Sequence, residues 1–350
     1  MPERPVDLRS DTVTKPTDMM RRAMAMADVG DDWYGDDPTV NKLQDRCAEV
    51  TGKDGGVYVA TGTMANQIAL HVFARSGHTV VAEATAHVVT TESSSSAVLS
   101  GIAFRALSAP RGQLTADVVA EAVRPDPYGV EVVDLVAVEN THQVGGGTVM
   151  PVDELRAIRK VTQEAGLPLY MDGARLFNAS VAADTPVADY AAEVDAVMFC
   201  LSKGLGAPIG SVLCGDEAFV AEARRVKILI GGAWRQAGIM AAAGLLALKD
   251  GPGRLAEDHA NARRLAEGLN DVAPGAIDPA AVETNILFVS TDGLGLDVWQ
   301  TLTTLREHGV LSNVVAGRIR FVTHRDVTAA DIDRTIAVWR ELVSERGSDA

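Results

Sequence analysis

Short apolar runs alternate with amphipathic stretches over the first 250 residues of the chain. The runs are rich in valine and are bounded by polar or glycine-containing segments, as expected of buried strands. They occupy residues 56–60, 79–83, 102–107, 132–140, 167–172, 195–200 and 210–215. Several intervening stretches have the apolar spacing of helices, among them 64–77 and 151–166. This alternation predicts an α/β fold with a mostly parallel, seven-stranded sheet covered by helices on both faces.

The pattern changes after about residue 250. A long helical stretch at 253–269 is followed by strand-like runs at 284–290 and 318–324, each with a helical stretch after it. The 350 residues also exceed what one small core holds. We therefore predict a second, small α+β domain at the C-terminus. The expected units are an N-terminal arm at 1–15, a large domain at 16–250 and the small domain at 251–350.

Composition and charge narrow the class of protein. Hydrophobic residues make up 47% and charged residues 23% of the chain, which is ordinary for a globular protein. The net charge of −15 argues against a nucleic-acid or anionic-membrane partner, and no run approaches 18 apolar residues. Because the N-terminus also lacks an apolar signal segment, we expect a cytoplasmic protein. The cysteines, at 47, 200 and 214, lack metal-ligand spacing, so we predict neither a disulfide framework nor a metal site.

Polar residues follow four of the predicted strands, at the carboxyl ends where open α/β sheets bind ligands. They are Gly62, Thr63, His142, Asp172, Arg175 and Lys203. Gly62 and Thr63 lie where a strand gives way to a helix, so the free amides of that helix suit a phosphate. Thr and Gly are equally common as ordinary helix caps, and both interpretations stay open for this feature alone.

Asp172 and Lys203 offer complementary chemistry. An aspartate at the end of a buried strand needs a cation or hydrogen-bond donors. Its partner is either Arg175, in a simple ion pair, or a protonated heterocyclic nitrogen, which leaves Arg175 free to bind a carboxylate. Lys203 follows the apolar run 195–200, where desolvation would lower the pKa of a lysine and favour Schiff-base formation, although it could also extend into solvent. A phosphate cradle, a ring-nitrogen partner and a Schiff-base lysine together indicate a pyridoxal 5'-phosphate site.

These segments resemble those of a known family. The motifs are DLRSDTVTKPT, VGDDWYGDDPTVNKLQ, TGTMANQIAL, AVENTHQVGGGTVMP, MDGARLFNA, LSKGLGAPIGSVL, GGAWRQAG and RFVTHRDVT. As an ordered set covering nearly the whole chain, they resemble the low-specificity L-threonine aldolases, in the β-eliminating-lyase group of fold-type-I pyridoxal-phosphate enzymes. The resemblance implies the fold-type-I architecture for the large domain, and a homotetramer built as a dimer of dimers.

The resemblance also implies a role for each matching residue. Lys203 carries the Schiff base, Asp172 pairs with the pyridine nitrogen, and His87 stacks on the cofactor ring. The implied phosphate ligands are Gly62, Thr63 and Arg235. The implied groups around the amino-acid substrate are Ser10, Arg175 and Arg320 at its carboxylate, His142 near its β-hydroxyl, and Tyr34 within the oligomer. Either histidine is a candidate general base, with His142 slightly preferred for the hydroxyl proton and water as an alternative.

Three positions depart from the family pattern. Thr91 stands where an aromatic residue is common, inside the polar tract 90–98, which we interpret as a loop or the start of a helix. Lys227 is displaced by one position, and Ala233 replaces a glycine. These changes fall on the side of the site where the β-substituent of a substrate lies, so they bear on substrate preference.

The predicted function is retro-aldol cleavage of L-threonine or L-allo-threonine, and related β-hydroxy-α-amino acids, to glycine and an aldehyde. The alternatives keep the cofactor and change the reaction: a phenylserine-type aldolase, a β-lyase or a racemase. A cofactor-binding protein without catalysis is an alternative from a different class. The released product distinguishes the enzymes, and exchange of the glycine α-proton separates any of them from a mere binder.

Overall fold

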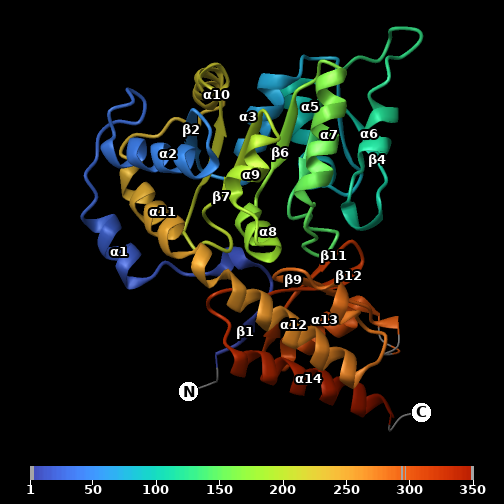
Figure 1. Cartoon of the computed structure of the whole chain (residues 1–350). Helices are drawn as coiled ribbons and strands as arrows, with labels where there is room; N and C mark the ends of the chain where they lie inside the picture. Colours follow the sequence, from blue (N-terminus) through green and yellow to red (C-terminus); the bar gives the residue numbers. More distant parts are fainter. Residues whose placement is uncertain (1–3, 293–294, 296, 348–350) are drawn as a thin grey trace.

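The computed structural model describes residues 4–292, 295 and 297–347. Seven strands form the main sheet, in the order β2-β8-β7-β6-β5-β3-β4 (Figure 1). Their bounds are β2 Gly55–Val59, β3 Thr79–Glu83, β4 Ala103–Leu107, β5 Val133–Glu139, β6 Leu169–Asp172, β7 Ala196–Cys200 and β8 Ser211–Gly215. Neighbouring strands are parallel except at β8, which runs antiparallel to β2 and to β7. The predicted α/β fold with a mostly parallel seven-stranded sheet is confirmed.

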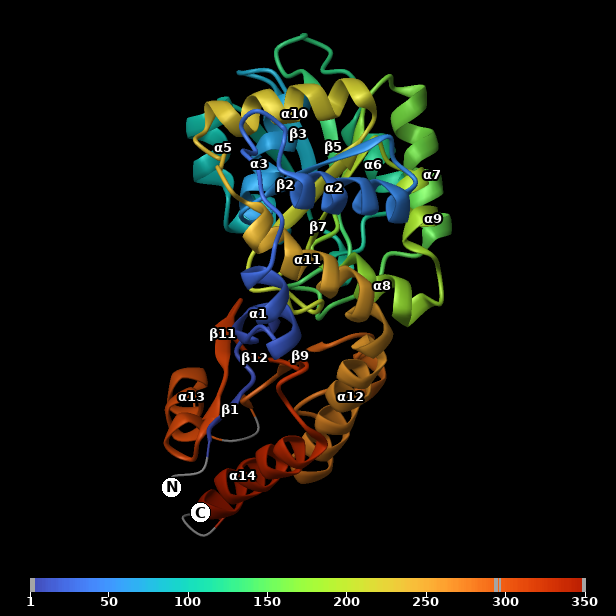
Figure 2. The same cartoon turned by 90° about the vertical axis from the view of Figure 1, so that its left-hand side faces the viewer.

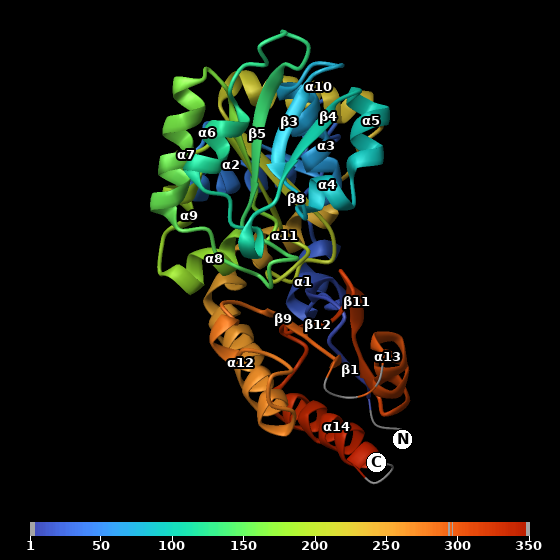
Figure 3. The ribbon, with the colours of Figure 1, turned by 90° about the vertical axis from the view of Figure 1, so that its right-hand side faces the viewer.

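Helices cover both faces of this sheet (Figures 2 and 3). One face packs against α3 (Gly62–Phe73) and α10 (Glu217–Leu229), and the other packs against α2 (Pro38–Thr51), α7 (Val152–Glu164) and α9 (Val187–Ala192). Successive strand residues point to opposite faces: Val57 belongs to the first core and Tyr58 to the second. Both faces are thus buried, which explains why the strands read as continuous apolar runs.

The helix boundaries follow from local signals in the sequence. Asp37 caps α2 by accepting from the backbone N of Thr39 (3.1 Å) and Val40 (3.0 Å), and Gly52 ends the helix with a φ of +66°. Pro151 immediately precedes α7, two acidic residues occupy its first turn, and Gly166 lies just beyond its end. The helix predicted over 151–166 is confirmed within two residues.

The C-terminal part of the chain forms a second, smaller sheet. Its strands β9 (Ile286–Val289), β11 (Asn313–Val315) and β12 (Arg318–Val322) are antiparallel, in the order β11-β12-β9. Helices α12 (Leu255–Val272), α13 (Val298–Glu307) and α14 (Ala329–Gly347) pack around it (Figure 1). The remaining helices are α1 Asp18–Ala25, α4 His87–Thr90, α5 Ser93–Ser100, α6 Ala116–Ala122, α8 Leu176–Ala183 and α11 Gly238–Asp250. Short 3-10 helices are η1 Asp11–Val13, η2 Pro110–Gly112, η3 Pro252–Arg254 and η4 Pro279–Ala281.

The N-terminal arm joins the C-terminal part of the chain. Strand β1 (Val6–Asp7) pairs in parallel with β10 (Val310–Leu311), and the backbone O of Leu8 accepts from the N of Val322 at 2.9 Å. Leu8 is fully buried in the same core as Phe321. The arm then turns toward the main sheet through η1, as Figure 2 shows. Residues 6–8 are therefore an integral part of the smaller core.

Two features of the fold differ from the predictions or extend them. Strands β1, β10 and β11 were not predicted, because each has at most three residues and depends on a distant partner. The polar tract 90–98 contributes mainly to α5, which begins at Ser93. The domain boundaries at 15/16 and 250/251 stay predictions. No helix in the described part of the chain is long and apolar enough to cross a membrane.

Candidate active site

The carboxyl ends of β2, β5, β6 and β7 lie along one edge of the main sheet, because these four strands run in the same direction. Gly62 and Thr63 follow β2, His142 follows β5, Asp172 ends β6 and Lys203 follows β7. The topology therefore places these five residues along a single edge, where open α/β sheets bind their ligands.

Asp172 is a buried carboxylate that neutral groups hold in place. Its Oδ2 accepts from Nδ2 of Asn66 on α3 at 2.8 Å, and its Oδ1 accepts from the backbone N of Ala174 at 3.0 Å. Arg175, three residues further on, is not its partner, so the ion pair considered between these two residues is not formed. The negative charge of Asp172 is consequently available to a cationic ligand such as a protonated ring nitrogen.

His87 begins α4 and is held at two points. Its backbone N donates to Oε2 of Glu139 at 2.6 Å, and its ring Nδ1 lies 2.6 Å from Oε1 of Glu92. The hydrogen bond to Glu92 raises the pKa of His87 against the effect of burial, and Asp172 raises it further. Ligand atoms of His87, Glu92 and Asp172 lie within 4.8 Å of one another. Because these atoms already hydrogen-bond to one another and to Asn66, we assign no metal to them.

Gly62 and Thr63 form the first turn of α3. The Thr61 side chain caps the helix by accepting from the backbone N of Met64 at 3.1 Å. A Cβ added at Gly62 would lie 3.0 Å from both Sγ of Cys200 and Cε of Met198, so this turn sits close against β7. A helix start this close to the strand ends presents its first amides to a ligand at the edge of the sheet.

Lys203 is half-buried and lies three residues beyond β7. Its side chain makes no hydrogen bond and no ion pair with the described part of the chain. Its charge helps to lower the pKa of Asp11 and opposes the rise in the pKa of His87, so the amine is within electrostatic reach of both. The amine is therefore unpaired and lies close to the other candidate residues.

Arg175 is paired with a carboxylate from the N-terminal arm. Its Nε and Nη2 donate to the two carboxylate oxygens of Asp11, each at 2.7 Å, and both side chains are buried. Burial by itself raises the pKa of Asp11, but the charge and hydrogen bonds of Arg175 outweigh it and lower the pKa to about 2. One interpretation of the sequence supposed that Arg175 is free to bind a carboxylate, but two of its nitrogens bind Asp11. Only Nη1 remains for a substrate.

Arg320 lies beside this pair and keeps donors free. Burial, followed by repulsion from Arg175, lowers the pKa of Arg320 to about 10, so the guanidinium remains charged at neutral pH. Its Nη2 donates to the backbone O of Arg9 at 2.9 Å, whereas its Nε is buried with no hydrogen-bond partner among the described residues. Ser10 is next to Asp11 on the arm, with 3.5 Å between Oγ and Oδ1. An unpaired buried guanidinium nitrogen here favours binding of a carboxylate.

His142 has little freedom to act as a base. The residue is fully buried, and its Nε2 lies 3.0 Å from Oε2 of Glu83. Its Nδ1 accepts from the backbone N of Gly145 at 3.1 Å, and Gly112 packs against the ring so closely that a Cβ there would clash. Both ring nitrogens are engaged, so the arrangement does not favour the slight preference given to His142 over His87.

Tyr34 and Arg235 lie together on an exposed surface. Tyr34 is 77% exposed, and the Arg235 guanidinium stacks 5.3 Å from the ring centroid of Trp33. The structure does not bring either side chain to the predicted site within this chain. The loop that carries Arg235 nevertheless approaches the start of α3, because a Cβ on Gly232 would lie 2.8 Å from Sδ of Met64. Lys227 is instead buried against Asp32, with 2.6 Å between Nζ and Oδ2.

The prediction omitted three residues: Asp11, Asn66 and Glu92. Asp11 could have been predicted from the sequence, because an acidic residue next to the candidate Ser10 can pair with one of the candidate arginines. Glu92 stood five residues after His87 in a tract interpreted only as a loop or helix start. Asn66 had no comparable signal, because the sequence does not show which strand the helix packs against, and so which residue this amide binds.

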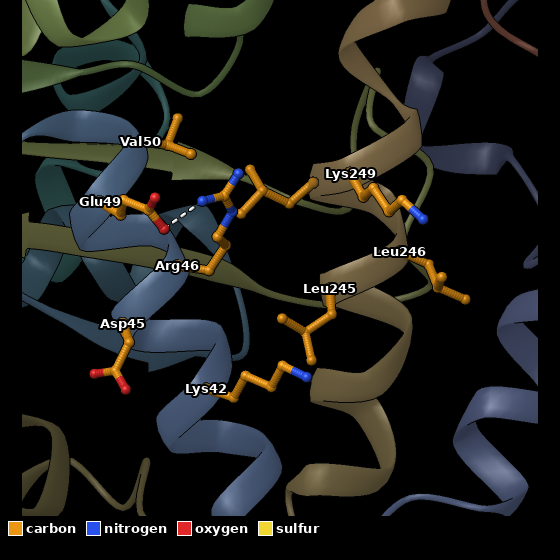
Figure 4. Close-up of a pocket in the computed structure, with 9 residues that line it drawn as sticks. Lys42, Asp45, Arg46, Glu49, Val50, Leu245, Leu246 and Lys249 are labelled. Carbon is orange, nitrogen blue, oxygen red and sulfur yellow. Dashed lines mark hydrogen bonds and ion pairs between the residues drawn. The ribbon is translucent and has the colours of Figure 1, made fainter.

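A separate cavity of about 660 Å³ lies between α2 and α11, away from these residues (Figure 4). Its walls carry Lys42, Arg46 and Lys249 around apolar Leu245 and Leu246. Arg46 is already paired with Glu49 across one turn of α2. None of the predicted site residues lines this cavity.

The residues at the sheet edge fit pyridoxal 5'-phosphate. Asp172 would supply a buried carboxylate for the ring nitrogen, and the turn at Gly62, which packs closely against β7, would provide free amides for the phosphate. The Lys203 amine, which is unpaired among the described residues, would supply the Schiff-base nitrogen. His87 lies close to Asp172, whose charge raises the pKa of the histidine. These groups match the three attachment points that the cofactor requires.

Comparisons with known proteins bear on the whole chain. Residues 7–292 match the sequence model of a family described as "Beta-eliminating lyase". The chain is 40% identical to the low specificity L-threonine aldolase of Escherichia coli strain K12, over 97% of this chain and 99% of that one. It is 37% identical to low-specificity L-threonine aldolase 1 of Arabidopsis thaliana, over 97% of each chain. It is also 30% identical to the alanine racemase TOXG of Cochliobolus carbonum, over 96% of this chain and 87% of that one.

Solved structures show the same fold. The threonine aldolase of Leishmania major superposes with a TM-score of 0.80 at 22% identity, covering 97% of this chain and all of that one. The serine palmitoyltransferase of Sphingomonas wittichii superposes with a TM-score of 0.76 at 17% identity, covering 98% of this chain and 88% of that one. At these identities the likeness concerns the fold alone.

Proposed function

The chain belongs to the beta-eliminating lyase family, and on that premise we propose that it is a pyridoxal 5'-phosphate-dependent aldolase. Its proposed reaction is reversible cleavage of L-threonine and L-allo-threonine to glycine and acetaldehyde. The observation that supports it is the position of Asp172, His87 and Lys203 at one sheet edge, next to the buried guanidinium groups of Arg175 and Arg320. The relatives named as threonine aldolases support the choice of substrate.

Each residue has a defined task in this proposal. Lys203 would hold the cofactor covalently through its side-chain amine. Asp172 pairs with the ring nitrogen, the amides at Gly62 and Thr63 bind the phosphate with Arg235, and His87 stacks on the ring. When bound, the cofactor supplies an electron sink for the charge left by Cα–Cβ cleavage.

The substrate carboxylate is bound by Arg320 and by the remaining donor of Arg175, with Ser10 beside them. Binding at this point would fix the orientation of the substituents on Cα, and so select which bond breaks. The proton of the β-hydroxyl leaves to a base, for which His87, His142 and water are candidates. The free Nε2 of His87 supports the first of these, because both ring nitrogens of His142 are engaged.

A second candidate function is racemisation or β-elimination in the same site. The similarity to a protein named as an alanine racemase supports keeping it open. The phenylserine-type aldolase is a separate alternative. Thr91, which follows α4 and is exposed, is smaller than the aromatic residue common at this position in the family, which would favour a bulkier β-substituent.

Product analysis tests these proposals. The purified protein loaded with pyridoxal 5'-phosphate is incubated with L-threonine, L-allo-threonine, phenylserine and L-alanine, with Lys203→Ala as the inactive control. We expect acetaldehyde and glycine from the first two substrates and no product from the control. Ammonia with 2-oxobutyrate from the threonines or with phenylpyruvate from phenylserine, or D-alanine from L-alanine, in each case without aldehyde, would replace the aldolase proposal by the second candidate. Aldehyde release by Lys203→Ala at the normal rate would remove Lys203 from the mechanism.

Assembly and location complete the proposal. We infer a homotetramer made of two dimers, in which Tyr34 reaches the site of a neighbouring subunit. The high exposure of Met26 (84%) and Tyr34 (77%) supports an interface on this side of the chain. The proposed location is the cytoplasm.

A further inference from the structure

We propose that Glu92 is a positioning residue of the candidate site: it fixes the proton of His87 on Nδ1 and, through Asn66, ties the alignment of His87 to that of Asp172. The inference deepens the proposed function, because the two residues it connects are those assigned to the face and the ring nitrogen of the cofactor.

Glu92 is buried, and donors surround its carboxylate. Only 1% of the residue is exposed. Oε1 accepts from Nδ2 of Asn66 at 2.9 Å and lies 2.6 Å from Nδ1 of His87, while Oε2 accepts from Nε2 of Gln67 at 2.9 Å. A carboxylate among amide donors acts as an acceptor only, so the proton in the short contact to His87 resides on Nδ1.

The placement of this proton decides what His87 can do. Because the proton on Nδ1 is hydrogen-bonded to Glu92, Nε2 of the neutral ring is unprotonated and can accept a proton. Within the described part of the chain, Nε2 has no hydrogen-bond partner. The charged groups facing His87 are Glu92, Asp172 and Lys203, and Glu139 binds its backbone N. Among these, Glu92 alone contacts the ring nitrogen and raises the pKa of His87 most.

Asn66 extends the effect to the other side of the site. Its Nδ2 donates to both Glu92 (2.9 Å) and Asp172 (2.8 Å), so one amide group connects the two carboxylates. The hydroxyl of Tyr170 donates to Oδ1 of Asn66 at 2.7 Å, which fixes the orientation of the amide. The chain His87–Glu92–Asn66–Asp172 is therefore continuous, and each link is buried or half-buried.

A purely local role for Glu92 does not account for its contacts. Glu92 precedes the first residue of α5, where an acidic side chain could cap the helix. Its side chain makes no such cap and turns instead toward α3 and α4. The side chain thus binds His87 and Asn66 and does not cap the helix, as expected when its position serves the site.

The first test needs no substrate. Nitrogen-15 NMR of the histidine rings in the cofactor-free protein reports which nitrogen carries the proton, with His87→Gln used to assign the signal. We expect the neutral ring to carry its proton on Nδ1, with a strongly deshielded, slowly exchanging hydrogen. A neutral ring protonated on Nε2 would overturn the proposal.

The second test compares Glu92→Gln with Ser96→Ala. Ser96 is also buried on α5 and bonds to Gln67, but not to His87, so it is the matched control. We expect Glu92→Gln to lower the pKa of His87 by about one unit, a tenfold change in proton affinity, and Ser96→Ala to leave it unchanged. Equal values for the wild type and Glu92→Gln would contradict the proposal.

Cofactor binding and the pH dependence of catalysis, measured on the enzyme with pyridoxal 5'-phosphate, provide a third, independent test. For Glu92→Gln we expect weaker pyridoxal 5'-phosphate binding in a fluorescence titration, and an acidic limb of the kcat/KM profile displaced to lower pH. If the wild type cleaves no β-hydroxy amino acid but the His87 proton and pKa behave as stated, the proposed function fails and the role of Glu92 stands. If cleavage occurs and the ring proton does not respond to Glu92→Gln, the role of Glu92 fails alone.

Discussion

Asp11 engages Arg175 through both carboxylate oxygens, which makes the site depend on a residue from the N-terminal arm. Asn285 donates to the same carboxylate at 3.3 Å, so the pair also touches the start of β9. A guanidinium left alone in this position would be a buried, unpaired charge. Removal of Asp11 should therefore destabilise the fold as well as weaken substrate binding.

We predict that Asp11→Asn lowers the free energy of unfolding by about 3–5 kcal/mol, as for other buried pairs that lose one partner. Urea denaturation measures the change. The matched control is Asp7→Asn, which breaks a partly exposed pair with Arg9 on the same arm and should cost under about 1 kcal/mol. Similar losses for the two variants would show that Arg175 does not need Asp11 as its counterion.

The pH dependence of Asp11 follows from its lowered pKa. In the folded state the pKa is about 2, against an ordinary value of 3.8. The contribution of Asp11 is thus fully present above about pH 4 and is lost as the pH falls toward 2, because the unfolded state takes up the proton first. Over this window the stability of Asp11→Asn should fall less steeply than that of the wild type.

At the scale of elements, the start of α3 is where packing and ligand binding meet. Gly62→Ala places a methyl group 3.0 Å from Cys200 and Met198. We predict that the turn shifts and that affinity for pyridoxal 5'-phosphate falls roughly tenfold, about 1.4 kcal/mol. The control is Gly253→Ala, where a Cβ meets no other atom within 4 Å. Unchanged cofactor affinity in Gly62→Ala would separate this turn from the phosphate.

A hydrogen bond between His259 and Asn178 connects helices α8 and α12, and burial keeps the histidine neutral at pH 7. His259 lies 2.9 Å from Oδ1 of Asn178, and burial lowers the pKa of His259 to about 4. The unfolded chain binds a proton near pH 6.5, so stability is lost as the pH falls from about 6.5 to 4, by up to about 3 kcal/mol.

We predict that His259→Gln, which can still donate to Asn178, flattens this part of the stability curve measured in urea between pH 7 and 4. His308→Gln is the control, because His308 lies on the surface 3.5 Å from Glu341. A wild-type curve with the same slope as that of His259→Gln would contradict the assignment.

The sequence predicted the elements whose signal is local. All seven strands of the main sheet, the helix at 151–166 and the two longer strands of the small sheet were predictable, because buried valine-rich runs and helix caps act over a few residues. Strands β1 and β10 were not, because two residues become a strand only through a partner some 300 positions away. Asn66 and Glu92 were not predicted for the same reason, because their roles depend on which residues pack against α3 and the start of α5.

At the scale of the whole molecule, the exposed position of Tyr34 leads to a prediction about shared sites. If Tyr34 acts in the site of a neighbouring subunit, Tyr34→Ala and Lys203→Ala are each inactive alone. Mixed dimers of the two variants contain one intact site, so co-refolding equal amounts should restore about a quarter of the wild-type activity. Activity of Tyr34→Ala alone, or no recovery in the mixture, would count against shared sites.

The pairing of the arm with the last part of the chain has a consequence for protein synthesis. Val6 and Asp7 are synthesised some 300 residues before their partners Val310 and Leu311. At bacterial and eukaryotic translation speeds this delay is roughly 15–60 s. The main sheet can form in that time, while Asp11 still lacks the framework that carries it to Arg175. We therefore expect a nascent chain, or one terminated before Val310, to be inert even when Lys203 and Asp172 are in place.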